Sequence, residues 1–380
     1  MNFQPLKDFL DFYLPMLGVP GSDTVVYRDG QEVFRYQSGF DSLRMHTPVR
    51  PDALYYIYSV TKITTAIAAT QLIERGEIVA TDPLYAYFPE YRRVGVRHKG
   101  KDGSFEIREA KNPILIRHLL TMTSGLNYDL SRDSIARLRE RTGGRCPTVD
   151  FARAIADDPL EFEPGTKYLY GLSLDVMGAL VELVSGQKFG EYCKEHIFDP
   201  LGMKDTTFGL PEDRLSRLAT QYSYNERNKC AIEIGPFDCP FILGTAFESG
   251  GAGLVSTVDD QIRIAEALTH LGKGANGERI LSSRAVELMR SNALPAELLP
   301  DFAVCQQAGY GYGYGVRSNL DPASVGNLMP KGEFGWDGAK LCYLSACPES
   351  GVSFFHAEHM GGLHAVLIPR LRNVIYSCLD

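Results

Sequence analysis

The sequence predicts an α/β protein in which both ends of the chain build one α/β domain and a helical domain is inserted between them. Three observations support this prediction. The apolar fraction of 44% and the charged fraction of 23% are those of an ordinary globular chain. Alternating patterns typical of strands occur near both ends, and short helical patterns with long loops fill the middle. We therefore expect residues 1–84 and 236–380 to form the α/β domain and residues 85–235 the helical domain.

Near the N-terminus, after a short amphipathic segment, the pattern predicts a β-hairpin and then a helix. Residues 23–38 contain two alternating apolar runs that flank Asp29 and Gly30, a pair that favours a two-residue turn. Residues 59–75 are rich in alanine and apolar on one face, and Gly76 provides a stop signal. We expect this helix to be part of the α/β domain.

Two helices are predicted in the middle of the chain. Residues 113–126 (PILIRHLLTMTSGL) predict one that ends at Gly125, and residues 172–186 (LSLDVMGALVELVSG) predict another that ends at Gly186. Farther along, the pattern predicts three strands and a closing helix, over residues 309–316, 337–346, 351–360 and 363–379.

Charge and composition exclude several classes of function. The net charge is −8 and no basic stripe is present, which disfavours nucleic-acid binding. The N-terminal apolar run is interrupted by Asp11 and Pro15, and it lacks the features of a signal peptide or a membrane span. The eight cysteines lack metal-binding spacing, which favours reduced thiols in the cytoplasm. We expect no cofactor, no metal and no membrane partner, and the oligomeric state is left open.

Ser59 and Lys62 carry the strongest indication of chemistry. A serine and a lysine three residues apart on a helix share one face. At the start of a helix a lysine cation is disfavoured, and burial lowers the pKa of its amine further. A neutral amine can accept the proton of the serine hydroxyl, which makes the serine a nucleophile. This spacing is expected roughly once by chance in such a chain, and a second copy, Ser185 and Lys188, spans a predicted helix stop and is attributed to chance.

An ordered set of motifs around this pair resembles the serine β-lactamase and penicillin-binding-protein superfamily. Besides YSVTK at residues 58–62, it comprises IRHLLTMTSGL, PGTKYLYGLSLDVMG, IFDPLGMKDTTF, FESGGAGLVSTVDD and GERILS, in the expected order over roughly residues 20–360. The chain is most similar to class C β-lactamases and to the esterases that share their fold. The resemblance implies a β-lactamase/transpeptidase-like fold, with an antiparallel sheet flanked by helices, an inserted all-helical domain and a pocket between them.

The second motif of the family implies a role for Tyr170. This tyrosine occupies the position from which the family's phenol shares a proton with the serine and the lysine and passes it to the leaving group. Tyr168 is interpreted as structural. Leu172 stands where β-lactamases usually carry an asparagine that binds the substrate amide, and leucine cannot form that bond.

The third motif is matched by Trp336, Asp337 and Gly338, followed by Ala339. The resemblance implies that the N–H groups of Ser59 and Ala339 stabilise the oxyanion. β-Lactamases and peptidases carry a lysine or histidine in this motif, and esterases of this fold carry Trp-Gly-Gly. Trp336 offers no positive charge to a substrate carboxylate and Asp337 would repel one, which favours a neutral substrate.

Other residues fit these motifs less well. His359-Met360-Gly361 also fits the third motif, but it lies too near the C-terminus. His356 and His359 are interpreted as strand residues rather than metal ligands, and no G-x-S-x-G or H-E-x-x-H is present. We therefore expect a serine hydrolase that acts through an acyl-enzyme on a small neutral ester or amide, most similar to a carboxylesterase. A β-lactamase or D-amino-acid peptidase, and a catalytically silent binding protein of the same fold, are the alternatives.

Overall fold

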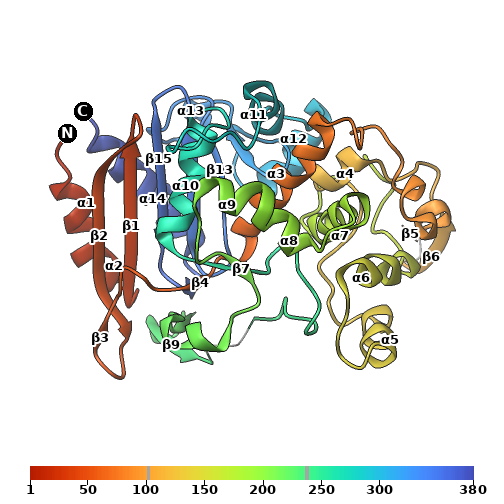
Figure 1. Cartoon of the computed structure of the whole chain (residues 1–380), viewed down its shortest axis with the longest axis horizontal. Helices are drawn as coiled ribbons and strands as arrows, with labels where there is room; N and C mark the ends of the chain where they lie inside the picture. The colour runs from red at the N-terminus through yellow and green to blue at the C-terminus, as the bar shows by residue number, and fades with distance from the viewer. Residues whose placement is uncertain (101–102, 236–238) are drawn as a thin grey trace.

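An eight-stranded antiparallel sheet forms the central layer of the computed structural model, which describes residues 1–100, 103–235 and 239–380 (Figure 1). The strand order is β11-β12-β13-β14-β15-β1-β2-β3, and every neighbouring pair is antiparallel. The strands are β1 Gly21–Arg28, β2 Gln31–Ser42, β3 Thr47–Pro48, β11 Tyr310–Tyr312, β12 Arg317–Asn319, β13 Phe334–Asp337, β14 Cys342–Cys347 and β15 Val352–Ala357.

The two ends of the chain meet within this sheet. Strand β1 pairs with β15, so the N-terminal hairpin extends a sheet made by C-terminal strands. The predicted hairpin is confirmed: Asp29 and Gly30 both have positive φ, at 51° and 77°, as a tight turn between twisted strands requires. The prediction of an antiparallel sheet flanked by helices is also confirmed.

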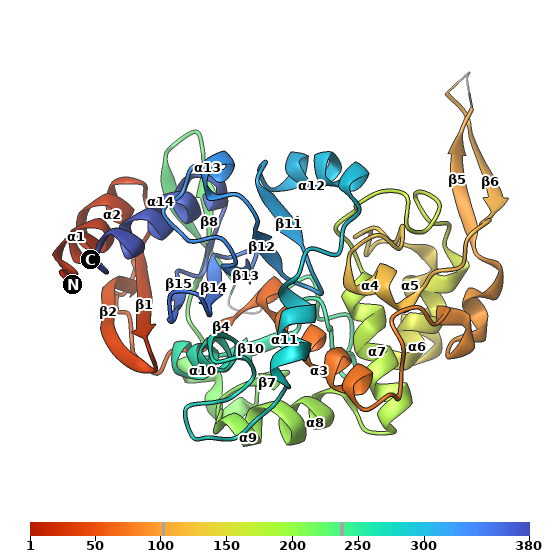
Figure 2. The same cartoon turned by 90° about the horizontal axis from the view of Figure 1, so that it is seen from above.

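Helices cover both faces of the sheet because its strands alternate in side-chain direction. On β1, Val25 belongs to the core shared with α3 and α10, whereas Val26 belongs to the core shared with α14 and the N-terminal helices. Phe355 and Phe354 on β15 divide in the same way. Figure 2 shows α14 and α1 together at one end of the molecule. These helices are α1 Gln4–Asp8, α3 Thr61–Glu74, α10 Val258–Thr269 and α14 His364–Ser377.

The middle of the chain is rich in helices but is not exclusively helical. Residues 85–235 also contain the hairpin β5–β6, which projects from the molecule (Figure 2), and strands β7, β8 and β9. The hairpin was not predicted, although Phe105 and Ile107 alternate with charged residues in β6. This short apolar face stays exposed instead of packing on the core. The domain limits remain a prediction, and residues 236–238 lie outside the described residues. The elements are β5 Gly95–Lys99, β6 Phe105–Glu109, α4 Ile116–Leu120, α5 Asp133–Arg141, α6 Thr148–Ala154, α7 Ser173–Ser185, α8 Phe189–Cys193, α9 Asp199–Leu201, β7 Thr207–Phe208, β8 Gln221–Asn225 and β9 Cys230–Ile234.

The helices predicted over 59–75, 172–186 and 363–379 and the strand over 351–360 are confirmed, as α3, α7, α14 and β15. The long helix predicted over 113–126 is wrong, because α4 ends at Leu120. The carbonyls of Leu120, Met122 and Thr123 accept hydrogen bonds from distant backbone segments instead of continuing the helix.

Two predicted strands were too long. The segment 309–316 turns after β11, and the segment 337–346 is divided by a turn at Gly338–Leu341 between β13 and β14. The remaining strands and helices are β4 Tyr55–Tyr56, β10 Leu254–Ser256, β16 Met360–Gly361, α2 Leu14–Met16, α11 Ser283–Arg290, α12 Leu299–Cys305 and α13 Pro322–Val325. Across the described residues, no helix combines the length and apolar character needed to cross a bilayer.

The contact between α3 and α7 provides a test of this packing. Leu180 on α7 is fully buried, so Leu180→Ala is expected to lower the free energy of unfolding by about 2–5 kcal/mol. Leu288 on α11 is 42% exposed, and Leu288→Ala is expected to change it by no more than about 0.5 kcal/mol. Denaturant unfolding measures both values, and equal losses would contradict the assignment of Leu180 to the core.

Candidate active site

Ser59 lies in a single 3-10 turn, Tyr58–Val60, that leads directly into α3. Tyr58 adopts a positive φ of 46°, an unfavourable conformation for a bulky residue. Its hydroxyl donates a 2.5 Å hydrogen bond to Gln221 Oε1, which helps to hold it in place. Ser59 is 8% exposed and lines a pocket, so its hydroxyl is sheltered but can be reached.

The amine of Lys62 contacts three oxygen atoms. Its Nζ lies 3.1 Å from Ser59 Oγ, 2.7 Å from Tyr128 Oη and 2.6 Å from the carbonyl oxygen of Gly251. A carbonyl oxygen can only accept, so one amine proton is committed to Gly251. When the amine is neutral, it can also donate to Tyr128 and direct its lone pair at Ser59. That arrangement is the one required of a general base.

Burial shifts the charge state of Lys62 towards the neutral amine. The side chain is fully buried, and loss of hydration lowers its pKa to about 7. The negative charges of Asp175 and Asp337 oppose this shift. A neutral amine is therefore accessible near physiological pH, which satisfies the condition set by the sequence hypothesis.

The glycine-rich segment that follows Ser249 positions the acceptor for Lys62. Asp175 on α7 is buried, and its carboxylate accepts hydrogen bonds from Ser249 Oγ and from the Gly251 N–H. Thr65 on α3 donates to the Gly250 carbonyl at 2.6 Å. Helices α3 and α7 thus fix this turn against the lysine.

Tyr170 lies in the loop before α7, beside Ser59 and Lys62. Its hydroxyl accepts a 2.8 Å hydrogen bond from Trp336 Nε1, and its ring centroid is 4.6 Å from Lys62 Nζ. Burial raises the pKa of Tyr170, and hydrogen bonds with Ser59 and Trp336 oppose that rise. The three residues predicted from the motifs are therefore brought together.

Tyr128 is a site residue that the sequence hypothesis missed. It follows the end of α4, and its hydroxyl accepts from Lys62. Its ring centroid lies 5.5 Å from that of Tyr170, and burial raises its pKa well above the usual value. The available signal was its place two residues after TSGL in a motif of the family. Nothing in that motif distinguishes a phenol that contacts lysine from a core aromatic residue.

The third motif borders the pocket from β13. Gly338 follows this strand and packs so closely on the segment before Ser59 that an added Cβ would lie 2.2 Å from the Ile57 carbonyl oxygen. The pocket has a volume of about 240 Å³. Its lining comprises Ser59, Tyr168, Tyr170, Cys305, Gln306, Trp336, Asp337, Ala339 and His364.

Three other residues of the sequence hypothesis lie in or near this pocket in surroundings that the sequence did not indicate. Tyr168, expected to be structural, is buried but also lines the pocket. Leu172 is buried in the core and does not line the pocket. Asp337 does line it, and the fully buried Arg317 lies 3.8 Å from the Asp337 carboxylate.

Neither of the two histidines lines the pocket. His356 lies on β15 as predicted, whereas the strand placement of His359 is wrong, because this residue has a positive φ of 57° and lies between β15 and β16. His356 bonds to Thr24 at 2.7 Å and to Glu358 at 2.9 Å. His359 contacts the Ala219 carbonyl at 2.9 Å, and burial lowers its pKa to about 3. The described residues contain no cluster of three or more His, Cys, Asp or Glu side chains that could hold a metal ion, and all eight cysteines are free.

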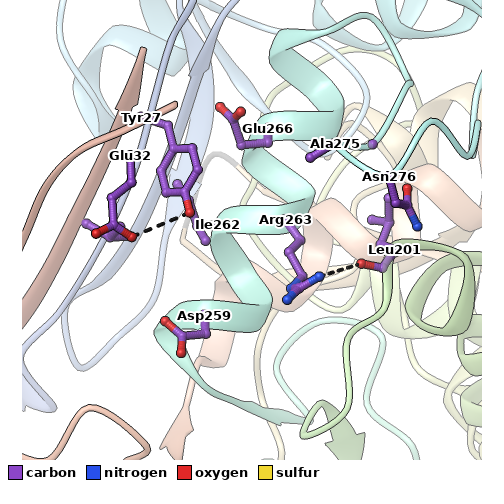
Figure 3. A pocket seen from close by; sticks show the side chains of 11 residues that line it. Tyr27, Glu32, Leu201, Asp259, Ile262, Arg263, Glu266, Ala275 and Asn276 are labelled. Atoms are coloured by element: carbon purple, nitrogen blue, oxygen red, sulfur yellow. Dashed lines mark hydrogen bonds between the residues drawn. The ribbon is translucent and has the colours of Figure 1, made fainter. Parts of the chain in front are cut away.

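A larger cavity of about 360 Å³ lies between the β1–β2 hairpin and α10 (Figure 3). Arg263 there donates to the Leu201 carbonyl, and Tyr27 donates to Glu32. Because its lining contains no serine–lysine pair, volume alone does not make it the candidate active site.

Comparison with known proteins identifies the group to which this arrangement belongs. The Beta-lactamase family model matches residues 7–356. The chain belongs to the beta-lactamase family. Protein Rv1367c of Mycobacterium tuberculosis (strain ATCC 25618 / H37Rv) is 31% identical over 339 residues, which cover 87% of this chain and 83% of that protein. Esterase EstB of Burkholderia gladioli is 31% identical over 350 residues, 84% of this chain and 80% of its own.

Solved structures in this family's fold superpose on nearly the whole chain. EstCE1, described as a hydrolase with promiscuous acyltransferase activity, has a TM-score of 0.80 at 24% identity and covers 98% of this chain and 99% of its own. Unliganded simvastatin synthase (LovD) from Aspergillus terreus, a selenomethionyl derivative, has a TM-score of 0.82 at 23% identity and covers 99% of both chains. The β-lactamase/transpeptidase-like fold is confirmed, and membership of this family supports the predicted acyl-serine hydrolase.

The two tyrosines are expected to respond differently to loss of the hydroxyl. Tyr170→Phe should lower kcat for an ester by about 10²- to 10⁴-fold, the range typical of a lost acid–base group. Tyr128→Phe should lower it by roughly tenfold or less, because Lys62 keeps its contacts with Ser59 and Gly251.

Steady-state kinetics with a p-nitrophenyl ester measures both effects. Tyr27→Phe, in the larger cavity, is the matched control and should keep wild-type kcat. A larger loss for Tyr128→Phe than for Tyr170→Phe would exchange the roles assigned to the two phenols.

Proposed function

We propose that this protein hydrolyses small neutral carboxylic esters through an acyl-enzyme formed on Ser59. One observation carries the proposal: a fully buried lysine amine with a pKa lowered to about 7 lies within hydrogen-bond distance of a serine hydroxyl that faces a pocket. This pairing supplies a nucleophile without a histidine.

In the proposed first step, Ser59 Oγ attacks the ester carbonyl while its proton passes to Lys62. The N–H groups of Ser59 and Ala339 stabilise the negative charge that develops on the carbonyl oxygen. Tyr170 delivers its hydroxyl proton to the departing alkoxide and regains a proton from the Lys62 ammonium, so the alcohol leaves with both residues neutral again. Water then attacks the acyl-serine with the same groups acting in reverse, which releases the acid and restores Ser59.

The pocket favours a neutral acyl donor over a β-lactam. Trp336 has no cationic group for a substrate carboxylate, and its only polar hydrogen is donated to Tyr170. Asp337 adds negative charge at the pocket, partly offset by Arg317. The relatives named Esterase EstB and Lovastatin esterase support ester hydrolysis in this family.

The setting of the reaction is proposed from composition. Eight free thiols fit a reducing compartment, and we place the enzyme in the cytoplasm, acting on a small-molecule acyl substrate. The net charge of −8 is consistent with the absence of a nucleic-acid partner.

A covalent probe tests the nucleophile directly. A fluorophosphonate should add once to the wild-type protein, and peptide mass spectrometry should locate the adduct on Ser59. Ser59→Ala should abolish both the adduct and hydrolysis of p-nitrophenyl esters. Ser185→Ala, which alters the chance copy of the motif, should preserve both.

Three results would contradict the proposal. An adduct on another residue would show that Ser59 is not the nucleophile. Turnover of nitrocefin or D-alanyl peptides faster than that of esters would favour a β-lactamase or peptidase, and no labelling with any acyl donor would favour a silent binding protein.

A further inference from the structure

His364, the first residue of α14, contacts the turn that follows β13. Its Nε2 lies 2.7 Å from the carbonyl oxygen of Gly338, and its side chain lines the Ser59 pocket. A carbonyl oxygen has no proton to give, so Nε2 carries the proton and donates. This contact links the start of α14 to the Gly338–Ala339 peptide, whose N–H is the second oxyanion donor in the proposed mechanism.

The Gly338 carbonyl is held by two donors at once. Besides His364, the Leu341 N–H donates to it at 2.8 Å across the turn. The Gly338–Ala339 peptide is planar, and its C=O and N–H point in opposite directions. Fixing the C=O on one side therefore fixes the direction of the Ala339 N–H on the other.

The Ala339 N–H is available to a ligand. Ala339 is exposed and lines the pocket with Ser59, and among the described residues its N–H donates to no protein acceptor. By contrast, the neighbouring Gly338 N–H is committed to the Cys342 carbonyl at 2.7 Å. The turn thus presents one free N–H to the pocket, on the same peptide that His364 holds.

We infer that His364 is a positioning residue, which orients and polarises the Gly338–Ala339 peptide so that the Ala339 N–H faces the developing oxyanion. Donation to the C=O of an amide strengthens its N–H as a donor, because hydrogen bonds in a chain polarise one another. An oxyanion donor acts mainly in the transition state, so the contribution of His364 belongs in kcat rather than in KM. The inference rests on the proposed function, since it presupposes an acyl transfer at Ser59.

Two substitutions separate the hydrogen bond from simple packing. His364→Leu removes the donor and should lower kcat by about 10- to 100-fold, less than the ~10²–10³-fold loss typical when an oxyanion donor is deleted outright. His364→Gln places an amide N–H at similar reach and should recover most of that loss. KM should change less than about threefold in both variants, because the ground-state contacts remain.

The matched control is His270→Leu. His270 is another partly exposed histidine whose ring bonds to a backbone carbonyl, that of Glu266 at 2.9 Å, and it lies outside the pocket lining. This variant should keep wild-type kcat and KM. Thermal unfolding of all three variants should show that they are folded.

A boronic acid inhibitor provides a readout that mere structural damage would not reproduce. Its tetrahedral adduct places an oxygen in the oxyanion site, so its affinity should fall in His364→Leu by the same factor as kcat/KM and recover in His364→Gln. Unchanged kcat in His364→Leu, a rise in KM alone, or equal losses in the Leu and Gln variants would each overturn the inference.

Failure of the proposed function would look different from failure of the inference. If the wild-type protein forms no fluorophosphonate adduct on Ser59 and hydrolyses no ester, the proposed function falls and the inference falls with it. If the wild-type protein is active and labelled at Ser59 while His364→Leu matches it, only the assignment to His364 is lost.

Discussion

The burial of one amine, that of Lys62, is the constraint on which the rest of the site depends. An ammonium group removed from water is costly unless its hydrogens are satisfied. Here the Gly251 carbonyl, the Tyr128 hydroxyl and Ser59 surround it. They come from a glycine-rich turn, from the loop after α4 and from the start of α3, so the lysine can be buried only when these segments converge.

The central sheet contributes to the site by bringing the end of strand β13 next to Ser59. Strand β13 ends beside the turn that carries Ser59, and the absence of a side chain at Gly338 permits contact with the Ile57 carbonyl. Trp336 then reaches Tyr170 across the pocket. The nucleophile, the phenol and the free N–H of Ala339 are thereby held by separate elements, which gives a site fixed before the substrate arrives.

Local chemistry was predictable from the sequence, and contacts between distant segments were not. The Ser59–Lys62 pair, the hairpin at Asp29 and helix α7 depend on neighbours within a few residues, so spacing and turn propensity identified them. Tyr170 and the Trp336 motif required the family resemblance. Tyr128 escaped detection because its role depends on Lys62, 66 positions away.

The misplaced end of α4 has a similar origin. Its apolar period continues to Leu126, but the carbonyls of Leu120, Met122 and Thr123 accept hydrogen bonds from distant segments. The neighbour of Asp337 was not predictable either, because nothing in the local sequence indicates that the fully buried Arg317 lies beside its carboxylate. Tertiary contacts determine where this helix ends and which charge lies beside Asp337, and the local sequence pattern does not indicate those contacts.

Direct titration of Lys62 tests the central claim. Carbon-13 NMR of a sample labelled at lysine Cε, with Lys62→Met used to assign the resonance, reports the charge of the amine as pH is raised. Since burial disfavours the cation, we predict that Lys62 loses its proton with a midpoint near the pKa of about 7, while exposed lysines remain charged. A Lys62 amine that stays protonated above pH 9 would contradict the account, because no neutral amine would then be available to Ser59.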